Sequence, residues 1–288
     1  MPELACLNGQ IMPIDEAKVP IEDRGLQFGD SVYEVIRVYS GYPWLLDEHM
    51  ARLQRSMQAI NMSGVDVSKI AQQAKQVLQR SGIGDAVIYI QVTRGVAPRN
   101  HLIPRGIEPN VIITVRHANP PQAEHYTTGV KAITAPDVRW GRPDIKSTNL
   151  LPNVLALEQA RQRGAFEAIL IDQREGLVTE GCHTNVFAVL NGALRTPPVN
   201  HRILPGITRQ FVINLATQAG IEVREEQLPL ADLMRAQEVF LTGTVCEVIG
   251  VTLLDNTMVG DGTVGTITRR LHALYREAVQ QAVASMER

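Results

Sequence analysis

Residues 140–149, WGRPDIKSTN, decide the fold together with residues 178–181, VTEG. Lys146 lies between a predicted strand at residues 130–135 and a predicted helix at residues 150–163. An unpaired ammonium group is costly to remove from water, so a lysine at such a junction is usually either paired or reactive. A reactive lysine amine can form a Schiff base with a carbonyl compound. The sequence therefore predicts covalent chemistry at Lys146.

The composition is that of a globular protein with no preference for polyanions. The 288 residues are 44% hydrophobic and include 28 basic and 30 acidic residues, for a formal net charge of −2. We expect no nucleic acid and no membrane as a partner. The sequence has no apolar run of about 18 residues, so we expect no transmembrane helix. The first residues lack a signal-peptide pattern. The three cysteines are scattered and predict neither a metal site nor a disulfide framework. We therefore expect a cytoplasmic enzyme without a metal.

The first half of the chain alternates strands and helices. Strands are predicted at residues 32–39, 86–93 and 111–116, and helices at residues 47–60 and 67–78. Asp47 is the predicted N-cap of the first helix. Two helices among long strands favour an α+β domain with a largely antiparallel sheet.

The second half begins after a stiff linker. Asn119-Pro120-Pro121 interrupts both strand and helix. We therefore predict a smaller N-terminal domain at residues 1–118, a linker at 119–122 and a larger C-terminal domain at 123–288. Beyond the helix at 150–163, strands are predicted at 168–172 and 239–242, a hairpin at Asn191-Gly192, and helices after Gly206 and from Thr266.

Glu180 and Lys146 together suggest a specific cofactor. The natural carbonyl partner of a reactive lysine is pyridoxal phosphate (PLP), which needs an acidic residue at its ring nitrogen and a cradle for its phosphate. Glu180 is the candidate acidic residue. A surface charge at the end of a strand remains an alternative for Glu180 at this point.

Two glycine-containing segments could bind the phosphate. In residues 203–209, ILPGITR, Gly206 precedes a predicted helix, whose free backbone N–H groups and positive dipole end bind anions. Thr208 can add a hydroxyl donor. Thr242-Gly243-Thr244 ends a predicted strand with small residues that permit close approach. Ordinary turns or caps are the alternative for both segments.

Arg99 and His101 form a third candidate site. They lie in the loop RGVAPRNH at residues 94–101. Arginine binds carboxylates through a rigid two-pronged donor, so this loop could bind the carboxylate of an amino acid. A solvated basic loop is the alternative.

The chain resembles the fold-type IV PLP enzymes and, within them, the D-amino-acid aminotransferases. The resemblance spans nearly the whole chain, with matching segments at residues 22–35 (EDRGLQFGDSVYEV), 48–53, 99–101, 144–150, 179–181, 185–187 and 204–209. It implies an α+β fold of two α/β domains with the cofactor between them. The segments at 22–35, 144–150 and 204–209 are shared with branched-chain aminotransferases and aminodeoxychorismate lyases. The Arg99-x-His101 pair favours the D-amino-acid branch.

The resemblance also implies roles for individual residues. Lys146 would hold the cofactor covalently and then move the substrate proton. Glu180 would bind the pyridine nitrogen, and the carboxylate of the substrate would be bound by Tyr33, Arg99 and His101. The phosphate would be held by Arg52, Ile207, Thr208 and Thr244, with Gly243 beside it. The loop at residues 99–101 would cross a homodimer interface, so that two chains share each active site.

The expected reaction is transfer of the amino group of a D-amino acid, such as D-alanine, to a 2-oxo acid, such as 2-oxoglutarate. An L-branched-chain aminotransferase, an aminodeoxychorismate lyase and a binding protein with a decayed site are the alternatives. The sequence departs from the family at residues 181–184, GCHT, where a serine-rich segment is usual, and at Gly243, where relatives carry serine. These departures put the roles of Cys182 and His183 in question.

Overall fold

A computed structural model describes residues 3–286. Its contacts divide the chain into two compact units. The first unit runs to Asn119 and takes in Ile145–Asn149 and the chain from Ala282 onward, whereas the second comprises Pro120–Asp144 and Leu150–Gln281. Residues 145–149, which follow the Pro120-Pro121 linker in sequence, therefore belong by their contacts to the first unit.

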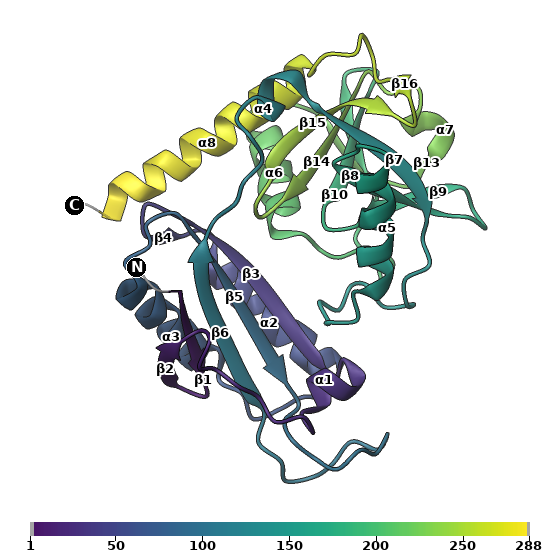
Figure 1. Cartoon of the computed structure of the whole chain (residues 1–288). Coiled ribbons are helices and arrows are strands. Elements are labelled where there is room, and N and C mark those ends of the chain that lie inside the picture. Colours follow the sequence, from purple (N-terminus) through teal and green to yellow (C-terminus); the bar gives the residue numbers. More distant parts are fainter. Residues whose placement is uncertain (1–2, 287–288) are drawn as a thin grey trace. The chain divides into compact units, whose positions relative to one another are not determined.

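The first unit is built on a six-stranded antiparallel sheet (Figure 1). Its strands, in sheet order, are β2 (Gln10–Pro13), β1 (Leu4–Leu7), β6 (Asn110–His117), β5 (Ala86–Thr93), β3 (Ser31–Tyr39) and β4 (Tyr42–Pro43). The short helix α1 (Arg24–Phe28) precedes β3 and ends at Gly29 in the left-handed region, φ 64°. The predicted strands at 32–39, 86–93 and 111–116 are confirmed.

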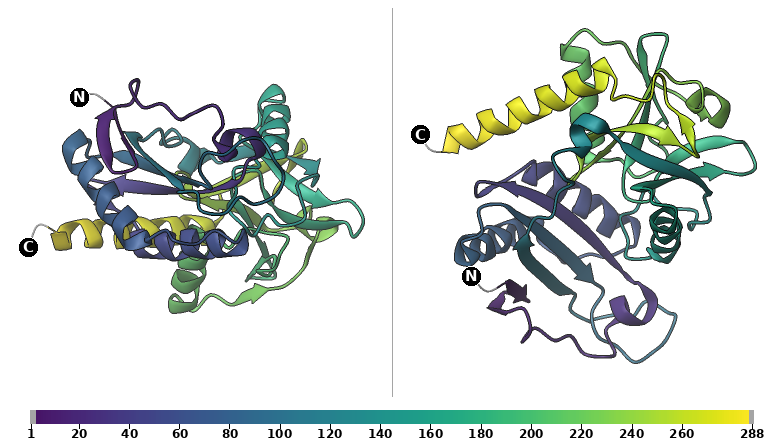
Figure 2. Two further views of the ribbon diagram at one scale, coloured as in Figure 1. Left: turned by 90° about the horizontal axis from the view of Figure 1, so that it is seen from below. Right: turned by 45° about the horizontal axis from the view of Figure 1, so that its top comes forward.

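Two amphipathic helices pack on this sheet, α2 (Leu46–Ala59) against β3 and α3 (Val67–Ser81) against β6 and β1 (Figure 2). Their apolar faces, with the inward residues of β3, β5 and β6, form one core that includes Ile145. Asp66 caps α3 by accepting hydrogen bonds from the backbone N–H groups of Ser68 and Lys69. The prediction of Asp47 as N-cap of α2 was wrong. Leu45 is the cap residue, at φ 53°, and Asp47 lies in the first turn, where its charge complements the helix dipole.

The second unit contains a ten-stranded mixed sheet. The order is β12 (Val223–Glu225), β11 (Ala193–Thr196), β10 (Asn185–Leu190), β14 (Glu238–Gly243), β15 (Glu247–Leu254), β7 (Val130–Pro136), β8 (Glu167–Asp172), β9 (Leu177–Gly181) and β13 (Leu228–Pro229), and β16 (Thr257–Met258) pairs with β15. The pairs β11–β12, β15–β7 and β7–β8 are parallel. Asn191 and Gly192 turn β10 into β11 at φ 52° and 79°, as a tight hairpin requires.

Five helices accompany this sheet, namely α4 (His125–Thr128), α5 (Leu151–Gln162), α6 (Ile207–Gln218), α7 (Leu230–Leu233) and α8 (Thr266–Met286). α5 packs on β8 and β7, and α6 packs on β14 and β12. The predicted helices at 150–163, after Gly206 and from Thr266 are confirmed. Within residues 3–286, no helix combines the length and the apolar character needed to cross a bilayer.

Candidate active site

Lys146 lies beside strand β3 in the first unit. Its backbone carbonyl accepts a hydrogen bond from the N–H of Tyr33 at 2.9 Å, and its own N–H donates to Ser56 Oγ at 3.2 Å. Its Nζ lies 4.1 Å from the centroid of the Tyr33 ring. Among residues 3–286, no carboxylate forms an ion pair with Lys146. The amine is therefore oriented by an aromatic face and is not paired with an acid.

Arg52 lies on α2, as does Ser56, and forms a buried charged cluster with His49 of α2 and Glu34 of β3. Its Nε and Nη2 donate to the two carboxylate oxygens of Glu34 at 2.7 and 2.8 Å, and His49 Nδ1 lies 2.7 Å from Glu34 Oε2. Burial alone would raise the pKa of Glu34, but Arg52 and His49 outweigh it and hold that pKa well below its usual range. Burial lowers the pKa of His49, aided by Arg52 and Lys146. Arg52 and Ser56 are four residues apart on α2, so both side chains project from one face.

Arg99 and His101 lie in the exposed loop between β5 and β6. The guanidinium carbon of Arg99 is 4.6 Å from the centroid of the Phe28 ring, and the His101 ring is 5.4 Å from the same ring. The first unit thus contains Tyr33, Arg52, Lys146, Arg99 and His101. The remaining predicted site residues lie in the second unit.

Glu180 is buried on β9 of the second unit. Its Oε2 accepts hydrogen bonds from Asn185 Nδ2 and from the backbone N–H of Leu204, both at 3.0 Å, and its Oε1 pairs with Arg139. Burial raises the pKa of the Glu180 carboxyl, and Arg139 opposes this effect. A carboxylate that is costly to ionise in its pocket gains from a cationic N–H donor, such as the protonated ring nitrogen of PLP.

The N-terminus of α6 offers an anion site. Gly206 is the N-cap residue and provides no side-chain cap, which leaves the N–H groups of Ile207 and Thr208 without an intrahelical acceptor. A Cβ at Gly206 would lie 2.0 Å from Asn185 Oδ1, so any larger residue here would require the Asn185 side chain to move. Thr208 is buried and Ile207 is half-buried.

Strand β10 connects the end of β14 to this helix terminus, because Asn185 of β10 contacts Gly206 and pairs with β14. Thr242 pairs in register with Asn185. The Thr242 hydroxyl is buried and has no hydrogen-bond partner within residues 3–286, while Gly243 and Thr244 are half-buried. An unsatisfied buried hydroxyl, unused helix N–H groups and small residues together fit a phosphate group. The second unit thus brings Ile207, Thr208, Gly243 and Thr244 to one region.

Arg139 is a candidate that sequence analysis missed. It binds Asp137 through two nitrogens, with Nε 2.9 Å and Nη2 2.7 Å from its oxygens, in addition to pairing with Glu180. The signal was an Arg two residues after an Asp at the end of a buried strand. Its partner Glu180 is 41 residues away in sequence, so pairing could not be read from spacing.

The segment at residues 181–184 is tied to a second buried acid, Glu167. Its carboxylate accepts hydrogen bonds from the backbone N–H of Cys182 at 3.2 Å and from Thr184 Oγ1 at 2.9 Å, and lies 3.0 Å from His183 Nδ1. Burial and the charge of Glu167 raise the pKa of the Cys182 thiol. Cys182 is therefore a protonated, buried group and is not poised for nucleophilic chemistry.

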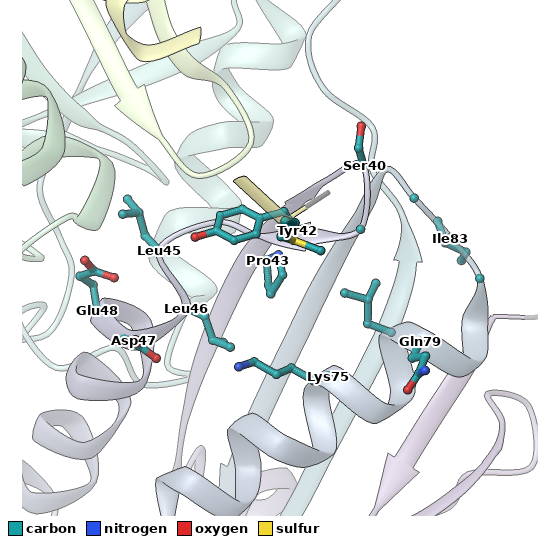
Figure 3. Close-up of a pocket in the computed structure, with 15 residues that line it drawn as sticks. Ser40, Tyr42, Pro43, Leu45, Leu46, Asp47, Glu48, Lys75, Gln79 and Ile83 are labelled. Carbon is teal, nitrogen blue, oxygen red and sulfur yellow. The ribbon is translucent and has the colours of Figure 1, made fainter. Parts of the chain in front are cut away.

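A separate cavity of about 810 Å³ lies in the first unit near the β3–β4 turn, the start of α2 and the end of α3 (Figure 3). Tyr42, Leu45 and Leu46 contribute apolar surface, and Lys75 and Glu48 contribute charges. None of the predicted site residues lines this cavity.

Comparison with known proteins gives consistent results. The model of the family "Amino-transferase class IV" matches residues 31–254. The D-alanine aminotransferase of Bacillus licheniformis is 42% identical over 281 residues, which cover 96% of this chain and 97% of that protein. The D-alanine aminotransferase of Listeria monocytogenes serotype 1/2a (strain 10403S) is 40% identical over 285 residues and 98% of both chains.

Solved structures of branched-chain amino acid aminotransferases are also similar. The Escherichia coli enzyme has a TM-score of 0.87 at 31% identity, and the match covers 94% of this chain and 92% of the E. coli chain. The T.th. enzyme with pyridoxamine 5'-phosphate has a TM-score of 0.88 at 30% identity, with coverage of 97% and 94%.

Proposed function

The chain belongs to the class IV aminotransferases, the fold-type IV PLP enzymes, and we propose that it transfers the amino group of a D-amino acid to a 2-oxo acid in a ping-pong reaction. The observation that most supports this is the 40–42% identity, over nearly the whole chain, to D-alanine aminotransferases. D-Alanine and 2-oxoglutarate are the expected substrates.

PLP, when bound, supplies a ring that withdraws electrons from the substrate carbon as its proton leaves. Lys146 would hold PLP through its side-chain amine. Glu180 would accept a hydrogen bond from the ring nitrogen, and Arg139 and Asn185 fix the direction of its carboxylate. The N–H groups of Ile207 and Thr208, with Arg52, Gly243 and Thr244, would surround the phosphate.

Lys146 would also act as the general base and acid. When it is free, its amine can remove the proton from the substrate Cα and hold it as an ammonium group until it is returned. Tyr33 keeps this amine in place through its ring face. A lysine reaches only one face of the substrate, so the position of the substrate carboxylate determines which enantiomer reacts. Tyr33, Arg99 and His101 would bind that carboxylate and thereby select the D-enantiomer.

We further propose a cytoplasmic homodimer in which the loop at residues 99–101 completes the partner's site. The same loop and α1 expose large apolar side chains, with Leu26 69% exposed and Leu102 76% exposed. We expect the partner chain of the homodimer to cover these side chains.

A mixing experiment tests the shared site. At D-alanine concentrations well below the raised KM of Arg99→Ala, dimers of Lys146→Ala chains and dimers of Arg99→Ala chains should each be nearly inactive. After random exchange of the two chains, half of the dimers are hybrids with one intact site, so about one quarter of wild-type activity should return. If mixing restores nothing, each site is built from one chain.

The main alternative is an L-branched-chain aminotransferase, favoured by the TM-scores of 0.87 and 0.88 to such enzymes. The visible absorption of the holoenzyme distinguishes the two when it is titrated separately with D-alanine and L-leucine. Loss of the lysine–cofactor band with D-alanine alone, together with pyruvate formation, supports the proposal. Loss with L-leucine alone would overturn the proposed role of Arg99 and His101 in selecting the D-enantiomer.

A further inference from the structure

Phe28, at the end of α1, contacts two of the three side chains of the proposed carboxylate site, Arg99 and His101. The Phe28 ring has the guanidinium carbon of Arg99 at 4.6 Å and that of Arg24 at 4.7 Å from its centroid, with the His101 ring at 5.4 Å. One aromatic ring therefore orients two arginines and a histidine. Ring contacts of this kind restrict a guanidinium to a plane while its N–H groups remain directed outward at its edge.

Arg24 holds the backbone between Arg99 and His101. Although it is only 4% exposed, Arg24 reaches the loop and donates from Nη1 to the carbonyl of Asn100 at 2.6 Å. The side chain of Asn100 accepts a hydrogen bond from the N–H of Leu102 at 3.0 Å. The residue between the two candidate ligands is thus fixed on both sides, which sets the direction in which Arg99 and His101 project.

Arg24 is itself immobilised by a buried ion network. Its Nε donates to Asp30 at 2.9 Å, and Arg94 Nε donates to the same carboxylate at 2.8 Å. Arg94 also donates to the backbone carbonyls of Ile60 and Asn61 at the end of α2. The loop is therefore connected through Arg24 and Asp30 to the packed core of the first unit.

The base of the loop is clamped to the same segment. The N–H of Arg24 donates to the carbonyl of Gly95 at 2.9 Å, and Asp23 forms a β-bridge with Val96. Gly95 has φ 108°, and a Cβ there would lie 2.1 Å from the carbonyl oxygen of Glu108. The loop is thus tied to α1 at its start and again at Asn100.

Arg99 has no acidic partner within residues 3–286. A guanidinium that is oriented by a ring and lacks a counter-ion is prepared to bind a carboxylate, because its side-chain entropy is already reduced before binding.

We propose that Arg24 and Phe28 are positioning residues that fix Arg99 and His101 for recognition of the substrate α-carboxylate. This inference rests on the proposed function of Arg99 and His101. Neither Arg24 nor Phe28 needs to touch the substrate. Their effect passes through the loop, and therefore appears in substrate binding and not in the proton transfer at Lys146.

The test uses holoenzyme variants and D-alanine kinetics. Phe28→Leu keeps apolar bulk but removes the ring, and should raise the KM for D-alanine about 5- to 30-fold with kcat changed less than twofold; this corresponds to about 1–2 kcal/mol at about 1.4 kcal/mol per tenfold. Phe28→Tyr should restore the wild-type KM. Arg24→Lys keeps the charge but loses the guanidinium group that donates to both Asp30 and Asn100, and should raise KM in the same way. Arg105→Ala, an exposed charge in the same loop, is the matched control and should have no effect.

A double-mutant cycle separates positioning from general loosening of the structure. Because part of the effect of Phe28 passes through Arg99, Phe28→Leu should raise KM by a smaller factor in the Arg99→Ala background than in the wild type. A full additional increase would overturn the inference, as would a wild-type KM in both Phe28→Leu and Arg24→Lys. Thermal unfolding and the absorption of the bound cofactor, unchanged from wild type, exclude misfolding as the cause of a raised KM.

Failure of the proposed function gives a different result. If Arg99→Ala leaves the KM for D-alanine unchanged, the carboxylate role of the loop is refuted, and the positioning role with it. If Arg99→Ala raises KM while the Phe28 and Arg24 variants do not, only the positioning role is refuted.

Discussion

Gly206→Ala tests how the N-terminus of α6 is coupled to Glu180. The Cβ would lie 2.0 Å from Asn185 Oδ1 and 3.2 Å from Asn185 Cγ. The backbone at Gly206, φ −64° and ψ 133°, is one that alanine adopts readily. The cost therefore arises from the side-chain contact and not from backbone strain, and the Asn185 side chain has to retreat by about 1 Å or more to reach normal contact.

The expected magnitude follows from the bonds that Asn185 makes. Its Nδ2 donates to Glu180 Oε2 and to the carbonyl of Leu204, both at 3.0 Å. A hydrogen bond to a charged group contributes about 1.5–3 kcal/mol. If the displaced amide loses Glu180, the carboxylate keeps only Arg139 and the Leu204 N–H as partners and is held less firmly for the ring nitrogen. At about 1.4 kcal/mol per tenfold, PLP should bind about 10- to 150-fold more weakly.

The assay is equilibrium binding of PLP to the apoenzyme, followed by absorbance, for Gly206→Ala, Asn185→Ala and the double variant. Asn185→Ala removes the atom that the new methyl group would meet, so Gly206→Ala should have almost no further effect in that background. Gly141→Ala is the matched control, because a Cβ there meets no atom within 4 Å. If Gly206→Ala weakens binding equally with and without Asn185, the methyl group acts directly on the phosphate and the coupling argument is refuted.

Three further predictions concern the first unit. Lys146→Ala should abolish transamination while PLP remains bound without a covalent link, and near-normal turnover would remove Lys146 from the mechanism. Glu34→Gln should reduce the free energy of unfolding in urea by about 3–5 kcal/mol, because it leaves Arg52 buried beside a neutral group. The control is Asp85→Asn, which should reduce it by less than about 1 kcal/mol, because the Asp85 side chain is 68% exposed in its pair with Arg37. Equal reductions in the two variants would contradict the burial argument. Burial lowers the pKa of His49, so below about pH 6.5 the unfolded chain binds a proton that the native chain does not. The free energy of unfolding should therefore fall as pH is lowered from 7.5 to 5.5, by up to about 1.4 kcal/mol per pH unit from this group, and a His49→Asn variant with the wild-type slope would refute this assignment.

Local signals made much of the fold predictable. The apolar pattern at residues 67–78 predicted α3, which Asp66 caps in the structure, and Asn191-Gly192 marked the hairpin between β10 and β11. These features depend on residues close in sequence. The start of α2 did not follow such a rule, because Leu45 adopts φ 53° and no side chain caps the helix.

Long-range pairing could not be predicted in the same way. The β-bridge between Val32 and Ser147 brings residues 145–149 to the first unit, although they follow the linker. The pattern of apolar and polar residues at 140–149 does not indicate that this segment pairs with a strand more than 100 residues earlier. The same limit applies to Arg139 and Glu180, whose pairing depends on how β7, β8 and β9 are ordered in the sheet.

The charges explain why Lys146 is the reactive candidate among the cations of the first unit. Each arginine of the first unit that is buried within residues 3–286 forms an ion pair with a carboxylate, namely Arg24, Arg37, Arg52 and Arg94. Lys146 is half-buried and contacts a ring instead. A close carboxylate would engage the Lys146 amine in an ion pair, whereas a ring contact orients the side chain without one. The sequence could identify Lys146 at a junction of strand and helix, but the lack of an acidic partner among residues 3–286 is a property of the folded chain.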